Sequence, residues 1–215
     1  MPGLNIKDKV ESARWSRVFK AWNEEGVALL FELATDYTRH YPKRFWGWVV
    51  LADALGEMAR YREAERALER AQRLAPTDRR ADIDAHWGHL YDVKCDLKRA
   101  ERWYRRALKQ AVGKDKMRCL IYLGGVLAKQ SRFAEAEQCQ RKAISLSTEP
   151  PDEAYYNLGL VLRAQQRYKE ALKYLNRAVR LDPAYAKAEA SWKDVMNAET
   201  FKKQNRREKS KSQRR

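Results

Sequence analysis

Apolar residues recur with helical spacing along most of the chain. Large apolar side chains lie three, four or seven positions apart, which places them on one face of an α-helix. Tyr155, Leu158 and Leu162 are one such set. The pattern predicts helices at 44–58, 61–74, 81–95, 97–110, 117–130, 133–146, 152–165 and 168–181.

The apolar pattern also repeats. Alanine pairs seven residues apart recur every 35 or 36 residues, as Ala64/Ala71, Ala100/Ala107, Ala136/Ala143 and Ala171/Ala178. A small residue precedes each pair by about one helix length and follows a large apolar one: Leu51-Ala52, Trp87-Gly88, Leu123-Gly124 and Leu158-Gly159. Small residues at these positions let neighbouring helices approach closely. A repeat of this length is typical of stacked helical hairpins, because one hairpin cannot bury its own apolar stripe.

The repeat resembles the tetratricopeptide repeat. In the unit DEAYYNLGLVLRAQQRYKEALKYLNRAVRLDP, Tyr155 stands where the family prefers Trp, and Leu158-Gly159 matches its Leu-Gly pair. Ala171, Ala178 and Pro183 match its Ala, Ala and Pro positions. The resemblance implies an all-α protein, a right-handed α-solenoid of stacked helix-turn-helix repeats. It also implies a concave surface, lined by the first helix of each repeat, that binds another protein.

The predicted organisation follows from these units. We expect a tail at 1–10, a degenerate first repeat at 11–42, four repeats within 43–183 (44–78, 81–113, 117–149 and 152–184), a capping helix at 184–200 and a basic disordered tail at 201–215. In the degenerate repeat, Trp15, Phe19 and Trp22 keep the helical spacing. Asp84 and Gln140 stand where the family usually has a large apolar residue, so we expect less regular packing in the second and third repeats.

The net charge of the chain indicates a second class of candidate partner. The chain of 215 residues has 45 Lys and Arg against 29 Asp and Glu, a formal net charge of +16. A basic chain attracts polyanions, so nucleic acid or an anionic surface is a candidate partner. The first residues lack the apolar core of a secretory signal, and no apolar run reaches the length of a membrane span. We therefore expect a cytoplasmic protein, or a nuclear one if the source is eukaryotic.

The sequence contains no motif of a catalytic site. The cysteines Cys95, Cys119 and Cys139 are odd in number and form no CxxC pair. His86 and His89 lie one helical turn apart with Asp82 and Asp92 nearby, but the spacing fixes no complete ligand set for a metal. We expect neither enzymatic activity, nor a cofactor, nor a metal site.

Two binding surfaces remain open. By analogy with the family, a partner peptide would contact the first helices of the repeats at these residues: Trp46, Val49, Asp53, Glu57, Asp82, His86, His89, Asp92, Arg118, Tyr122, Tyr156 and Asn157. The family's carboxylate clamp of Lys, Asn and Arg is not assembled here, although Asn157 fits one of its places. The alternative is polyanion binding by a basic helix and the basic tail, through Lys98, Arg99, Arg102, Arg105, Arg106, Lys109, Lys202, Lys203, Arg206 and Arg207.

The two surfaces correspond to two functions. The first is a non-catalytic scaffold or adaptor that binds a peptide or helix segment of a partner protein in its concave groove. The second is association with RNA or DNA, mostly through phosphate contacts and therefore with little sequence preference. The oligomeric state and the identity of the partner are not encoded in these patterns.

Overall fold

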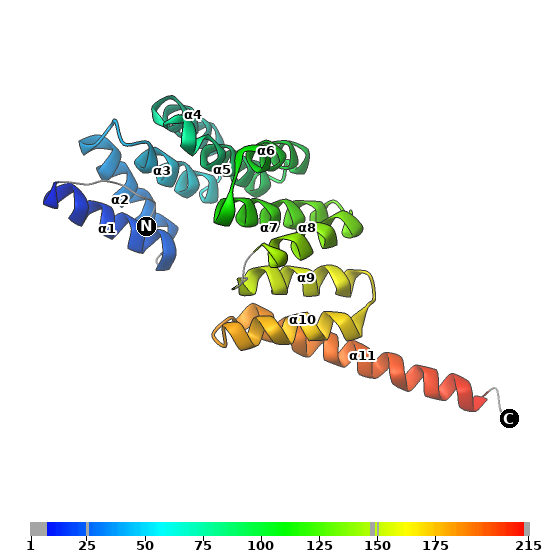
Figure 1. The fold of residues 1–215 in the computed structure, drawn as a ribbon. Helices are drawn as coiled ribbons and strands as arrows, with labels where there is room; N and C mark the ends of the chain where they lie inside the picture. Colours follow the sequence, from blue (N-terminus) through cyan, green and yellow to red (C-terminus); the bar gives the residue numbers. More distant parts are fainter. Residues whose placement is uncertain (1–7, 25, 147–148, 150, 213–215) are drawn as a thin grey trace. The chain divides into compact units, whose positions relative to one another are not determined.

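The predicted all-α fold is confirmed by the computed structural model. It describes residues 8–24, 26–146, 149 and 151–212, with only the backbone described for 205–212, and these residues include helices but no strand. The chain divides into two compact units, Met1–Ala111 and Val112–Arg215. Figure 1 shows the helices following one another as antiparallel hairpins within each unit.

Unit 1 contains three helical hairpins. Its elements are α1 (Lys9–Glu24), α2 (Val27–His40), α3 (Phe45–Glu57), α4 (Tyr61–Leu74), the short 3-10 helix η1 (Thr77–Arg79), α5 (Arg80–Val93) and α6 (Leu97–Gln110). Each helix packs on the next in sequence, and α3 of the second hairpin also meets α5 of the third. The core is therefore continuous along the unit instead of closed within each hairpin.

Unit 2 contains two hairpins and a long terminal helix. Its elements are α7 (Gly113–Lys129), α8 (Phe133–Ser145), α9 (Asp152–Ala164), α10 (Tyr168–Leu181) and α11 (Ala186–Ser212). α7 packs on α9, and α11 covers the face of α10 with a further contact to α9. Buried Val195 of α11 joins the cluster of Leu158, Leu162, Ala171 and Leu175.

The same turn ends the first helix in each of the four regular repeats. Ala59, Cys95, Ser131 and Gln166 adopt left-handed backbone angles, with φ of 58°, 60°, 61° and 60°. In the first of these turns, the Arg60 N–H donates to the Leu55 carbonyl and the Ala59 N–H to the Gly56 carbonyl. These are the two hydrogen bonds of a Schellman motif, which ends a helix and redirects the chain into the next one. All four turns use it without glycine at the left-handed position.

Small residues set the contact between the two helices of a hairpin. A Cβ atom built on Gly88 would lie 2.8 Å from the Tyr104 ring, and one on Gly159 would lie 2.5 Å from Leu175 Cγ. Both distances are far below a normal van der Waals contact, so any larger residue there would push α5 from α6 or α9 from α10. This contact explains the small residue that recurs in the sequence.

The two polar residues at apolar positions are fully buried. Asp84 is 2% exposed and receives a bond from Arg106 Nε at 2.9 Å and another from Gln110 at 3.3 Å. Gln140 is 0% exposed and packs against Gly124. The helices around both residues keep the hairpin packing of the other repeats. Local hydrogen bonds thus compensate for part of the cost of polar burial.

Two structural features near the ends of the chain, a buried carboxylate in α1 and the length of α11, were not expected from the composition. In α1, Glu11 is 4% exposed, and its carboxylate accepts bonds from Arg44 Nε at 2.6 Å and from the Tyr37 hydroxyl at 3.0 Å. At the other end the predicted capping helix and part of the predicted disordered tail form one helix, because α11 continues to Ser212.

Candidate partner-binding surfaces

Aromatic rings gather on the surface formed by α1, α3 and α5, which we call the inner face of unit 1. Trp22 of α1 and Trp46 of α3 both pack against His86 of α5, with ring centroids 6.0 Å and 6.2 Å from the imidazole. Phe19 packs edge-on against Trp22 at 6.4 Å. We call Phe19, Trp22, Trp46 and His86 the aromatic cluster. It brings three successive first helices together on one surface.

The polar groups of this inner face are paired with one another. His86 Nδ1 lies 3.0 Å from Asp53 Oδ1, and His89 Nε2 lies 3.7 Å from Glu57. Buried Asp82 lies 3.5 Å from Arg79. Each predicted acidic site residue on α3, and Asp82 on α5, therefore already has a basic partner within unit 1.

The predicted site residues of unit 1 differ in how far they are buried. Val49 is 0% exposed and Trp46 is 5% exposed, so these two support the surface from below. Asp53, His86, His89 and Asp92 are half-buried, and Glu57 is exposed.

The corresponding residues of unit 2 are more open. Arg118 and exposed Tyr122 come from α7, while half-buried Tyr156 and Asn157 come from the adjacent α9. The Tyr156 ring packs on Tyr185, in the turn before α11, with centroids 5.0 Å apart. Asn157 makes no hydrogen bond with any described residue, so its amide is free to bind a ligand.

Glu153 lies one helical turn before Asn157 on α9. Burial raises the pKa of its carboxyl group, and the negative charge of Asp152 raises it further. No cation among the described residues pairs with it. Burial, together with the nearby Tyr156 and the carboxyl groups of the same surface, also raises the pKa of Tyr185 to about 12. α9 therefore presents an unpaired carboxyl group and an unpaired amide beside the Tyr156–Tyr185 pair, a mixture suited to binding a polar ligand.

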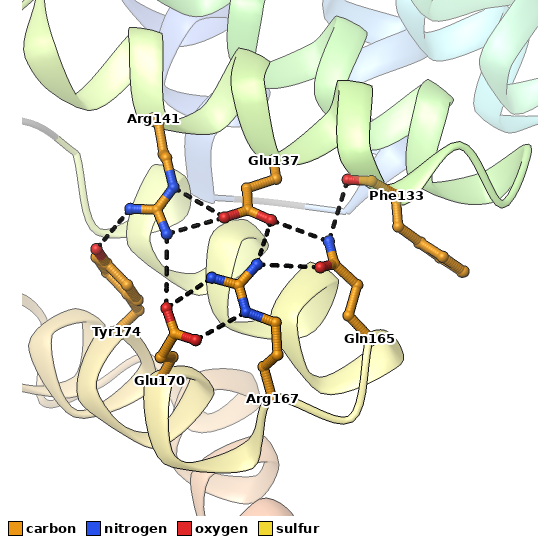
Figure 2. Close-up of polar contacts among 7 residues, drawn as sticks. All are labelled: Phe133, Glu137, Arg141, Gln165, Arg167, Glu170 and Tyr174. Carbon is orange, nitrogen blue, oxygen red and sulfur yellow. Dashed lines mark hydrogen bonds and ion pairs between the residues drawn. The ribbon is translucent and has the colours of Figure 1, made fainter.

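A polar network fixes α9 and α10 against α8, as Figure 2 shows. Glu137 accepts bonds from Arg167 Nη1 at 2.6 Å and from Gln165 at 3.0 Å, and Arg141 lies 2.8 Å from the same carboxylate. Glu170 binds Arg167 at 2.6 Å. Because Gln165 and Arg167 belong to the turn that ends α9, the network holds that helix, and with it Glu153 and Asn157, in place.

The cations of the alternative site are exposed on α6. This holds for Lys98, Arg99, Arg102, Arg105, Arg106 and Lys109. Two basic residues of the tail are described and already engaged: Lys202 lies 5.0 Å from the centre of the Tyr168 ring, and Lys203 lies 3.6 Å from Glu199. The side chains of Arg206 and Arg207 lie outside the described part of the structure.

Neither a metal site nor a membrane span is found in the described part of the chain. His, Cys, Asp and Glu side chains there form no group of three or more that could hold a metal ion. The helices in the same ranges lack the combination of length and apolar character needed to cross a bilayer.

Sequence reasoning did not include Trp22, Glu153, Tyr185 or Glu137 among the predicted site residues. The sequence did contain a repeated pattern that indicates part of the polar network around Glu137. An Arg stands just before three of the second helices and is followed three residues later by Glu, as Arg60/Glu63, Arg132/Glu135 and Arg167/Glu170. Nothing in the spacing indicated that Glu137 would join Arg167 of the next repeat.

Comparisons with known proteins agree with this architecture. Sequence profiles of the tetratricopeptide repeat match residues 47–78, 117–149 and 152–185. No curated protein matches the chain.

Solved structures share the fold at low sequence identity. TTC0263, a thermophilic TPR protein in Thermus thermophilus, is 15% identical with a TM-score of 0.75, over 86% of this chain and 98% of its own. YrrB, a TPR protein with an unusual peptide-binding site, is 16% identical with a TM-score of 0.55, over 82% of this chain and 88% of its own. The APC/C hetero-tetramer Cut9–Hcn1 is 16% identical with a TM-score of 0.69, over 86% of this chain, which spans only 36% of that one. With its repeated hairpins and matched profiles, the chain is a tetratricopeptide repeat protein, a helical scaffold for protein–protein interaction.

Proposed function

We propose that this scaffold binds an extended, basic peptide segment of a partner protein on the α7–α9 surface of unit 2. The observation that carries the proposal is the free Asn157 amide next to the unpaired Glu153 carboxyl group. A side-chain amide can donate to and accept from the backbone of an extended peptide at once. Glu153 would pair with a Lys or Arg side chain of the same peptide.

The contrast with unit 1 supports this choice of surface. There Asp53 and His86 bind each other, as do Glu57 and His89, so a ligand would have to break these contacts. In unit 2 the corresponding polar groups on α9 lose only water on binding. Aromatic side chains such as Tyr122 and Tyr156 supply apolar contact area at low entropy cost. The predicted residues Trp46, Val49 and Asp82 would act as supports for the inner face of unit 1, since they are buried.

The proposal can be tested by selecting binding peptides from a random display library on the immobilised full chain. The affinity of the selected peptides is then measured for the Asn157→Ala and Glu153→Gln variants. We expect a loss of about tenfold for each, because a lost hydrogen bond to a peptide or a charged partner is worth roughly 1–1.5 kcal/mol.

A matched control is Asn197→Ala on exposed α11, which removes the same amide away from α7 and α9. It should leave the affinity unchanged. Selected peptides that lack Lys and Arg, or that bind both α9 variants as tightly as the parent chain, would contradict the proposal.

A further inference from the structure

A second surface, on α6 and the neighbouring end of α4, has a different chemistry. All of its α6 cations are exposed, but they are not equivalent. Arg99, Arg105 and Arg106 lie within 3.0 Å of Asp96, Glu101 and Asp84 respectively. Lys98, Arg102 and Lys109 form no ion pair with any described residue, so half of these charges are not balanced locally.

Next to this helix lies a pocket of about 470 Å³ in unit 1. Its lining includes Arg106 of α6 and the buried residues Ile83 and Asp84 of α5. Three exposed residues, Glu69, Arg73 and Arg80, form its rim. Asp84 is occupied by Arg106 and Gln110. Arg73 has no ion pair with any described residue, and the two rim arginines outnumber Glu69, so the rim adds one net positive charge to that of α6.

Aromatic stacking holds two of the guanidinium groups in place. Arg106 lies 4.9 Å from the Trp103 ring centre, and Trp103 stacks on Trp87 with centroids 5.3 Å apart. Trp87 in turn stacks on Tyr91 at 6.0 Å, and Arg99 lies 5.2 Å from the Tyr91 ring at the other end. Arg99 and Arg106 are therefore held by contacts within unit 1, which leaves Lys98, Arg102 and Lys109 as the α6 cations without a partner among the described residues.

The arrangement of charge points to a polymer of anions. Lys98, Arg102, Arg105 and Lys109 follow one another at intervals of three or four residues on α6. They therefore form a row with one cation at each helical turn, spaced about 5.4 Å apart. A single anionic group would engage only one or two of them. Because Trp103 is covered by Trp87 on one side and approached by Arg106, the surface offers phosphate contacts and no open ring for base stacking.

We propose that Lys98, Arg102 and Lys109, together with Arg73 and Arg80, bind the phosphodiester backbone of a nucleic acid without sequence preference. The surface belongs to unit 1 alone and does not depend on the peptide site of unit 2. It also does not require the basic tail, whose described cations Lys202 and Lys203 are already engaged.

The test is fluorescence anisotropy of the full chain with labelled 20-nucleotide RNA, single-stranded DNA and duplex DNA, each in two unrelated sequences, between 50 and 200 mM salt. The main variant is the triple change Lys98→Gln, Arg102→Gln and Lys109→Gln. These side chains are exposed and unpaired, so circular dichroism should show an intact fold. We expect at least a tenfold loss of affinity at low salt and a salt slope smaller by about 2–3, as for the loss of that number of phosphate contacts.

A matched control removes the same charge elsewhere: Lys169→Gln, Lys173→Gln and Arg180→Gln on exposed positions of α10. We expect its affinity to stay within twofold of the parent chain, while Arg73→Gln with Arg80→Gln lowers it at least threefold. Equal losses in the α6 and α10 triple variants would show that only net charge matters and would overturn the assignment. So would the absence of binding at 50 mM salt, or tighter binding of a phosphopeptide of equal charge. Comparison of the RNA and DNA probes identifies the preferred nucleic acid.

Discussion

Gln140 Nε2 donates a 2.9 Å hydrogen bond to the backbone carbonyl of Ile121, while Gln140 Oε1 is buried without a partner among the described residues. An unpaired buried acceptor costs roughly 1–3 kcal/mol. The Ile121 carbonyl lies within α7, where the helix supplies its own donor. The side chain is therefore a net cost at a position where Leu68 and Leu175 stand in other repeats.

We predict that Gln140→Leu raises the free energy of unfolding by about 1 kcal/mol, because it removes the unpaired acceptor and adds apolar contact. Denaturant titration followed by circular dichroism measures the change. Gln138→Leu, at an exposed position of the same helix, is the control and should have no stabilising effect. Equal stabilisation by both changes would indicate that helix propensity, and not the buried acceptor, is responsible.

Ala59 allows a test of the turn that ends each first helix. Its φ is 58°, in the left-handed region. This conformation costs a non-glycine residue roughly 1 kcal/mol, so Ala59→Gly should stabilise the protein by up to about that amount. The same chemical change at Ala190, an exposed position inside α11, should destabilise it to a similar extent, since glycine is a poor helix former. Thermal unfolding that shows the same sign for both variants would contradict this account of the turn.

The fold could be predicted from the sequence because small and large residues recur at equivalent positions of each repeat. Gly159 and Leu175, sixteen positions apart, are in contact, and the sequence marks both by the small and large residues at equivalent places in each repeat. Helix ends could be predicted where the repeat is regular: the helix predicted at 61–74 coincides with α4. The start of α7 was missed, because this helix begins at Gly113, four residues before the predicted start.

The candidate sites were harder to predict from the sequence, because the ability of a residue to bind a ligand depends on which neighbouring side chains cover it. Trp46 and Asn157 occupy first helices of their repeats, yet Trp46 is buried and packs against His86, while Asn157 remains unpaired among the described residues. Helical periodicity gives the direction of a side chain and not its partner. In the same way, the composition of residues 201–215 predicted disorder, while the backbone continues α11 through Ser212.

Glu11 attaches α1 to the rest of unit 1. Its buried carboxylate accepts bonds from Arg44 and from the Tyr37 hydroxyl, whose pKa is raised by burial and by this hydrogen bond. Glu11→Ala should lower the free energy of unfolding by about 1–3 kcal/mol, because it leaves these donors unpaired. Hydrogen exchange should show the largest loss of protection in α1.

The control for this change is Glu32→Ala, at an exposed position of α2. It should change the free energy of unfolding by less than about 0.5 kcal/mol, as is usual for surface substitutions. Unchanged protection of α1 in Glu11→Ala would mean that the packing of Trp15 and Val18 and the Arg14–Asp36 ion pair retain the helix without Glu11.

Glu137 predicts a pH dependence for unit 2. Burial alone would raise the pKa of its carboxyl group, but hydrogen bonds from Gln165, Arg141 and Arg167 outweigh burial, and the pKa is lowered. A carboxyl group whose pKa is lower in the folded than in the unfolded chain stabilises the fold above the unfolded pKa, about 4.3 for Glu. That stabilisation disappears as the pH falls through the lower, folded pKa.

Glu137→Gln should therefore cost roughly 1–3 kcal/mol at pH 7, and the difference from the parent chain should shrink steadily below about pH 4.3. Urea titrations from pH 7 down to pH 3 measure it. The control Glu189→Gln removes an exposed pair with Lys193 on α11. Because exposed pairs contribute little, it should cost less than about 0.5 kcal/mol at any pH. A difference between Glu137→Gln and the parent chain that is the same at pH 7 and pH 3 would show that the shape of the side chain, and not its charge, maintains the contact between α8 and the turn before α10.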